Sequence, residues 1–237
     1  RTDLEADVNA LVILHLREAF HGRSGYTLSL TNTVPDKIGL FPKFAWPRVH
    51  NPTIEFDPDG GLANDIAAEE ARACAEIETA FARHDNRIAA IIIEPLQGEG
   101  GDNHFRAEFL QALRDYADAR EALLIFDEVQ TGFWGSGKPW LWQHYNIAPD
   151  IVAFGKKTQV CGIYCSERID EVENNVFQFP GRINSTFGGN LTDMLRCRRF
   201  LDIIEAEALG ENITARGDEM LAGLRMTARE TGGMYNV

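Results

Sequence analysis

Two short apolar stretches that each run into a polar side chain constrain the fold of this chain most. Residues 123–126 lead directly into Asp127, and residues 151–154 are followed, after a glycine, by Lys156, which lies 29 positions after Asp127. Short, continuous apolar runs of this kind indicate neighbouring parallel strands that are buried on both faces. The carboxyl ends of such strands border a crevice at one edge of the sheet. We therefore expect an acid and a lysine to face the same crevice.

The remainder of the chain alternates between strand and helix patterns. Strands are expected at residues 11–16, 88–93 and 122–126, and helices at residues 63–83, 105–119, 191–208 and 212–230, with a short polar helix near residues 167–174. Strand, helix, strand units joined by right-handed crossovers build a mainly parallel α/β sheet with helices on both faces. Residues 32–61 differ, because five prolines with aromatic residues between them predict an ordered but irregular excursion.

The composition excludes several classes of protein. A net charge of −13 with no basic run argues against nucleic acid and anionic membranes as partners. The four cysteines lie in no metal-ligand spacing, so we expect no metal site and reduced thiols. The longest apolar run is far shorter than the roughly 20 residues of a membrane span, and the first residues do not resemble a signal peptide. These features predict a soluble, cytoplasmic protein.

Three predicted strand ends carry residues that suit catalysis. Residues 94–101 contain three glycines and the acids Glu94 and Glu99, Asp127 is followed by Gln130, and Lys156 comes next. Taken singly, the loop is as well explained as a turn and the acid as a cap of the next turn, and a lone lysine after a strand is more often solvated than catalytic. Together, in sequence order at successive strand ends, they indicate one site. A lysine amine and a carboxylate are also the pair that pyridoxal phosphate requires, to hold its aldehyde and to keep its ring nitrogen protonated.

Five segments carry a resemblance to a known family. They are Phe20–Thr33 (FHGRSGYTLSLTNT), Glu94–Asp102 (EPLQGEGGD), Leu123–Gly132 (LLIFDEVQTG), Pro149–Gly162 (PDIVAFGKKTQVCG) and Arg182–Met194 (RINSTFGGNLTDM). With them the chain resembles the fold-type I, class III pyridoxal phosphate aminotransferases, and within that family most closely the L-lysine 6-aminotransferases. The resemblance implies the large domain of that fold.

The resemblance also implies roles in holding the cofactor. Lys156 corresponds to the lysine that binds the cofactor aldehyde and moves the proton, with Lys157 a bystander. Asp127 would pair with the ring nitrogen, Gln130 would hydrogen-bond the ring hydroxyl oxygen, and Phe20 would stack on the ring with His21 beside it. Thr186 would reach the cofactor phosphate of a neighbouring subunit, so a homodimer with shared active sites is implied.

Four residues are implied in substrate binding. Arg23 would hold a substrate carboxylate, because a guanidinium pairs with a carboxylate through two parallel bonds. Gln130 and Asn184 would line the substrate site. Glu99 corresponds to the family's switch carboxylate, which masks an arginine for the amino donor and releases it for 2-oxoglutarate. That arginine lies near the C-terminus of family members, beyond the residues of this chain.

These parallels predict the activity and the domain organisation. The expected reaction moves the terminal amine of L-lysine to 2-oxoglutarate, giving 2-aminoadipate 6-semialdehyde and glutamate. An ω-aminotransferase for ornithine or 4-aminobutyrate is the alternative within the family, and an inactive structural fragment is the alternative outside it. We expect residues 1–210 to be the central part of the large domain, incomplete at both ends, and residues 211–237 to begin the connection to a small domain.

Overall fold

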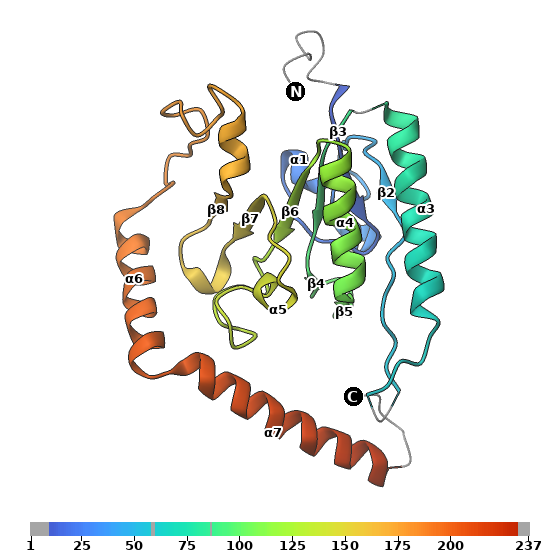
Figure 1. Ribbon diagram of the computed structural model, residues 1–237. Coiled ribbons are helices and arrows are strands. Elements are labelled where there is room, and N and C mark those ends of the chain that lie inside the picture. The colour runs from blue at the N-terminus through green and yellow to red at the C-terminus, as the bar shows by residue number, and fades with distance from the viewer. Residues whose placement is uncertain (1–9, 58–59, 86, 232–237) are drawn as a thin grey trace.

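The computed structural model describes residues 10–57, 60–85 and 87–231, and its centre is a six-stranded sheet (Figure 1). The strand order is β2-β1-β3-β6-β7-β8. Strands β1 (Val12–Leu16), β3 (Ile88–Ile93), β6 (Leu123–Asp127) and β7 (Ile151–Phe154) run parallel to one another. The edge strand β8 (Gly162–Cys165) is antiparallel to β7. The predicted α/β class with a mainly parallel sheet is confirmed.

Two long helices cover one face of this sheet. Helix α3 (Ile66–His84) begins at Asp65, whose side chain accepts a hydrogen bond from the Ala68 amide at 3.1 Å, and α4 (Ala107–Ala119) packs over β3 and β6. Both helices are amphipathic, as their 3.6-residue periodicity predicted. Their apolar sides and the facing strand residues form one core, which includes Leu14, Ile77, Ile91, Phe109, Leu113, Leu124 and Phe126.

The opposite face of the sheet is covered less completely. Ile92 and Ile125, which alternate with the core residues of β3 and β6, are half-buried. Helix α1 (Gly25–Leu28) lies behind the sheet in Figure 1, on the side away from α4. The prediction that strands 123–126 and 151–154 are buried on both faces therefore holds for the helix-covered face and only partly for the other.

The proline-rich excursion contains two elements that the sequence pattern did not predict. Helix α2 (Pro35–Ile38) is a single turn, and β2 (Arg48–Val49) pairs in parallel with β1 at the edge of the sheet. A two-residue strand is too short to show an alternating pattern, and it is held by main-chain hydrogen bonds that any residue type can make. The other described residues of the excursion, within 32–57 and 60–61, form no further helix or strand.

Several short elements connect the larger ones. They are β4 (Leu96–Gln97) and β5 (Asn103–His104), which form a small antiparallel ladder, α5 (Trp142–Tyr145), and the 3₁₀ turns η2 (Lys156–Thr158) and η3 (Glu167–Glu171). The predicted polar helix near residues 167–174 is thus a 3₁₀ segment.

The chain closes with α6 (Leu191–Ala206) and α7 (Leu209–Glu230), which extend away from the sheet (Figure 1). The expected domain boundary at residue 210 falls in the first turn of α7. The outer ends of the two expected domains, residues 1–9 and 232–237, lie outside the described residues, as does the start that was compared with a signal peptide. Within the described residues, no helix combines the length and the apolar character that crossing a membrane requires.

Candidate active site

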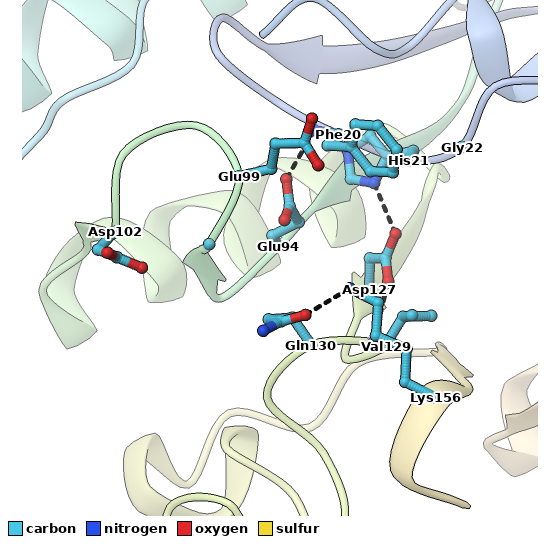
Figure 2. A pocket seen from close by; sticks show the side chains of 11 residues that line it. Phe20, His21, Gly22, Glu94, Glu99, Asp102, Asp127, Val129, Gln130 and Lys156 are labelled. Carbon is cyan, nitrogen blue, oxygen red and sulfur yellow. Dashed lines mark hydrogen bonds and ion pairs between the residues drawn. The ribbon is translucent and has the colours of Figure 1, made fainter. Parts of the chain in front are cut away.

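A cavity of about 520 Å³ lies at the carboxyl ends of the strands, where the sequence placed the site. Its walls come from the segments that follow β1, β3, β6 and β7, so residues far apart in sequence meet there (Figure 2). The volume suits a small organic ligand. The lining residues are Phe20, His21, Gly22, Glu94, Gly98, Glu99, Asp102, Asp127, Val129, Gln130 and Lys156.

Asp127 is the last residue of β6 and is held by two hydrogen bonds. Its Oδ2 lies 2.8 Å from His21 Nδ1, and its Oδ1 accepts from the Val129 amide at 3.1 Å. Asp127 is 8% exposed and His21 is 9% exposed. The His21 Nε2 atom is buried and has no hydrogen-bond partner among the described residues. The two hydrogen bonds to Asp127 hold its carboxylate in one orientation, and that carboxylate lines the cavity.

Glu128, the next residue, has a structural role instead. Its carboxylate is buried and accepts hydrogen bonds from the amides of Leu141 and Trp142, at 2.7 and 2.8 Å, and from Thr131 Oγ1 at 2.8 Å. Burial raises the pKa of Glu128. The two adjacent acids therefore differ in role, because Asp127 lines the cavity and Glu128 anchors the loop that follows β6.

The two adjacent lysines also differ in position. Lys156 lines the cavity, and its amine donates a hydrogen bond to Gln130 Oε1. Lys157 donates instead to the main-chain oxygen of Gln130, and burial together with the charge of Lys156 lowers its pKa. The strand register explains why Lys156 and Asp127 meet, since Asp127 pairs with Ala153, three residues before the lysine. Of the two lysines, Lys156 is thus the one that lines the same cavity as Asp127.

Glu94 is one of the two acids predicted at the end of β3, and no role of its own was assigned to it from the sequence. It follows β3, is 5% exposed, and accepts a hydrogen bond at 2.7 Å from the Phe20 amide. Figure 2 shows its carboxylate between the loop that carries Glu99 and the Phe20–His21 segment. Burial raises the pKa of Glu94 to about 7, with the charge of Asp127 adding to the effect and His21 and the Phe20 amide opposing it.

This shift predicts a pH-dependent stability. The ordinary pKa of the group is 4.5, so its contribution to folding is complete below that pH and is lost as the pH rises through about 7. The loss is up to about 3 kcal/mol, since one pKa unit corresponds to about 1.4 kcal/mol.

Glu94→Gln removes the titrating group. Urea unfolding of the cofactor-free protein at about pH 5 and about pH 8 should therefore show that the free energy of unfolding of the variant rises relative to that of the wild type at the higher pH. Glu108→Gln, an exposed change on α4, is the control. A wild-type-to-variant difference that is equal at both pH values would contradict the assignment.

Glu99 lies in the glycine-rich loop between β4 and β5, at the rim of the cavity. Its Oε1 accepts a hydrogen bond from the amine of Lys37, which comes from α2, 62 positions away in sequence. A Cβ on Gly100 would lie 2.2 Å from the main-chain oxygen of Glu18, so only glycine permits this approach of loop to strand end. The loop therefore packs against the segment that follows β1, and Glu99 on this loop lines the cavity.

The structure does not bring the other predicted site residues into the cavity. Arg23 is exposed and is not among the described residues that line it. Asn184 and Thr186 are exposed on the loop before α6 and are also outside the lining set. The roles of Arg23, Asn184 and Thr186 stay predictions.

The residues in the cavity suit the ring and aldehyde of pyridoxal phosphate. Phe20 and Val129 lie on opposite sides of Asp127 in Figure 2, an aromatic and an aliphatic wall for a flat ring. Asp127 offers a fixed carboxylate that could pair with a ring nitrogen, and Lys156 offers an amine that could hold an aldehyde. Val129 was overlooked, although it stands inside the segment that carried the resemblance.

Comparisons with known proteins agree with this geometry. The family model described as aminotransferase class-III matches residues 5–237. The chain belongs to the class III aminotransferases, whose fold, an α/β structure with a mostly parallel sheet, it shares.

Among its relatives, the chain is 54% identical over 212 residues to an L-lysine-epsilon aminotransferase of Mycobacterium bovis, covering 90% of this chain and 46% of that protein. A solved structure of a lysine aminotransferase from M. tuberculosis is 52% identical, with a TM-score of 0.88 and coverage of 94% of this chain and 51% of that one. A 4-aminobutyrate aminotransferase of Emericella nidulans is 36% identical, over 93% of this chain and 43% of its own length. The chain spans about half the length of the relatives it matches.

Proposed function

We propose that the enzyme carrying this chain transfers the terminal amino group of L-lysine to 2-oxoglutarate, forming 2-aminoadipate 6-semialdehyde and glutamate. The observation that supports an aminotransferase is the meeting of Lys156, Gln130 and Asp127 in one cavity. Sequence identity supports L-lysine as the amino donor, because the chain is 54% identical to a lysine-epsilon aminotransferase and 36% identical to a 4-aminobutyrate aminotransferase.

In this proposal the cavity residues hold pyridoxal phosphate and handle protons. The cofactor, when bound, supplies a ring that accepts electrons from the amine carbon. Asp127, held by His21 and the Val129 amide, would keep a positive charge at the ring nitrogen. Lys156 would hold the aldehyde, and its amine would serve as the base and acid that moves the proton. Gln130 accepts a hydrogen bond from that amine at its Oε1 atom and would also contact the ring hydroxyl oxygen.

The remaining roles belong to the same proposal. Arg23 binds the α-carboxylate of lysine, and Glu99 and Asn184 distinguish the two substrates. Thr186 contacts the cofactor phosphate of a second subunit in a cytoplasmic homodimer. Exposed apolar side chains next to Thr186 support an assembly there, since Phe187 is 80% exposed and Leu191 is 85% exposed. Residues 1–210 form the central part of the cofactor-binding domain, and residues 211–237 lead to a small domain.

The donor is tested by comparing amines in a coupled assay of the full natural polypeptide that carries this sequence. L-Lysine should give the highest kcat/KM with 2-oxoglutarate as acceptor, above L-ornithine and 4-aminobutyrate. Each removed or added methylene in a fitted pocket changes discrimination by about 10- to 200-fold. Turnover of 4-aminobutyrate or ornithine without lysine would establish the alternative ω-aminotransferase, and no turnover of any amine would favour an inactive protein.

A further inference from the structure

Thr31 is a fully buried residue of the segment after β1, and the reaction as described so far does not use it. We propose that Thr31 is a positioning residue: its hydroxyl fixes the main chain of His21 and Gly22, so that the His21 ring holds the Asp127 carboxylate in place for the cofactor ring nitrogen. The inference rests on the proposed function for the identity of the cofactor. It adds to the site a residue that is not among the described residues lining the cavity.

The first argument is the pair of hydrogen bonds that the Thr31 hydroxyl makes. Its Oγ1 accepts from the His21 amide at 3.0 Å and donates to the Gly22 main-chain oxygen at 2.6 Å. The main-chain oxygen of Thr27 lies farther away, at 3.5 Å. Because a hydroxyl has a single hydrogen to donate, that hydrogen goes to the nearer oxygen of Gly22. One hydroxyl thus satisfies a donor and an acceptor in two successive residues of the main chain.

The second argument is that side chains, rather than the sheet, hold the segment that carries His21. Residues 20–22 follow β1 and belong to no helix or strand. The Phe20 amide donates to Glu94 Oε1 at 2.7 Å. The Glu94 carboxylate and the Thr31 hydroxyl therefore hold three successive residues of this segment.

The third argument is that Thr31 is itself anchored. It lies just after α1, and its amide donates to the Leu28 oxygen at 3.3 Å. The amide of the next residue, Asn32, donates to the Ala19 oxygen at 2.9 Å, and its side-chain Oδ1 accepts from the Glu18 amide at 2.6 Å. The main chain at Thr31 is therefore tied to the chain on both sides, and its hydroxyl can fix the neighbouring segment.

The fourth argument is the direct link from this segment to the acid. His21 Nδ1 lies 2.8 Å from Asp127 Oδ2, and the His21 side chain is only 1% exposed (Figure 2). An imidazole ring is rigid, so the position of its Nδ1 atom follows the main chain of the same residue. A buried ring also leaves little room for water to take its place beside the carboxylate. Loss of the Thr31 hydroxyl should therefore loosen the hold on Asp127.

A double-mutant cycle on the cofactor-loaded full polypeptide tests whether Thr31 acts through Asp127. Thr31→Val keeps the shape of the side chain and removes its hydroxyl. We expect it to lower kcat about three- to tenfold in the wild-type background, the kinetic equivalent of one neutral hydrogen bond, and less than about twofold in the Asp127→Asn background. The loss in the wild-type background should shrink as the pH is lowered, because protons from solution then reach the ring nitrogen. A loss that is equal in both backgrounds, or independent of pH, would overturn the proposal.

Two matched variants separate the hydroxyl from the fold. Thr31→Ser keeps the hydroxyl and should stay within about twofold of the wild-type kcat. Thr27→Val makes the same substitution at an exposed residue of α1, whose hydroxyl donates to the Ser24 oxygen at 2.8 Å, and should leave kcat unchanged. Equal losses in Thr27→Val and Thr31→Val, or an equal loss in Thr31→Ser, would contradict the assignment.

Hydrogen exchange of the cofactor-free polypeptide provides a measurement that needs no activity. Mass spectrometry of a peptide containing residues 20–22 should show the His21 amide exchanging at least about tenfold faster in Thr31→Val than in wild type. Thr31→Ser and Thr27→Val should stay within about threefold of wild type. Unchanged exchange in Thr31→Val would show that the hydroxyl does not hold this segment, and would reject the proposal.

The affinity for pyridoxal phosphate keeps this inference separate from the choice of donor. Titration of the cofactor-free polypeptide with pyridoxal phosphate needs no amine substrate. Thr31→Val should raise the Kd about three- to tenfold in the wild-type background and less than about twofold in the Asp127→Asn background. If lysine is not turned over but the affinities follow this pattern, the proposed function fails and the role of Thr31 stands. Equal changes of Kd in both backgrounds reject that role whatever the donor is.

Discussion

Lys156→Ala is expected to abolish transamination, with a loss of at least about 10³-fold, because positioned proton transfer alone contributes about 10²- to 10⁴-fold. The variant removes both the amine that holds the aldehyde and the base that moves the proton. Lys156 is the lysine that lines the cavity and contacts Gln130 Oε1. The absorbance spectrum of the full polypeptide with added pyridoxal phosphate provides the measurement. Its band near the edge of the visible range should be present in wild type and absent in Lys156→Ala.

Lys157→Ala is the matched control for that experiment. It removes the same side chain one position later, where the amine contacts the Gln130 main-chain oxygen instead of the cavity. The control should keep the absorbance band and most of the activity. An unchanged spectrum in Lys156→Ala, or loss of the band in Lys157→Ala alone, would show that the catalytic lysine has been wrongly assigned.

Asp127→Asn is expected to reduce kcat by about 10²- to 10³-fold, the size observed when one charge-stabilising group is removed from an active site. Asparagine fills the same space beside His21 but has no charge with which to keep the ring nitrogen protonated. Because that proton can also come from solution, part of the lost activity should return as the pH is lowered. Steady-state kinetics between about pH 5.5 and about pH 8.5 test both points.

Asp102→Asn is a suitable comparison. Asp102 also lines the cavity, but it is exposed and lies apart from Asp127 in Figure 2. Its neutralisation should change kcat by less than about threefold, the effect of a solvated charge. Wild-type kcat with a flat pH profile in Asp127→Asn would exclude a pairing with the ring nitrogen.

Much of the fold was predictable because it depends on local patterns. The apolar runs near residues 88–93 and 123–126 became β3 and β6, and the helical periodicities became α3 and α4. Where the pattern was weak the prediction was less accurate. The edge strand β2 has two residues, and η3 is a 3₁₀ segment where a helix was expected.

By itself, the sequence determined which strand ends would border the cavity, and that Asp127 and Lys156 would both line it. Parallel strands place their carboxyl ends at one edge, so the order of acid and lysine along the chain was sufficient. Only the tertiary structure decided how the side chains pair. His21 meets Asp127 across 106 positions, Phe20 meets Glu94 across 74, and Lys37 meets Glu99 across 62. Such pairings depend on how loops from different strands fold back over the sheet. The periodicity of a sequence cannot predict them, because it indicates only the local helices and strands that those loops connect.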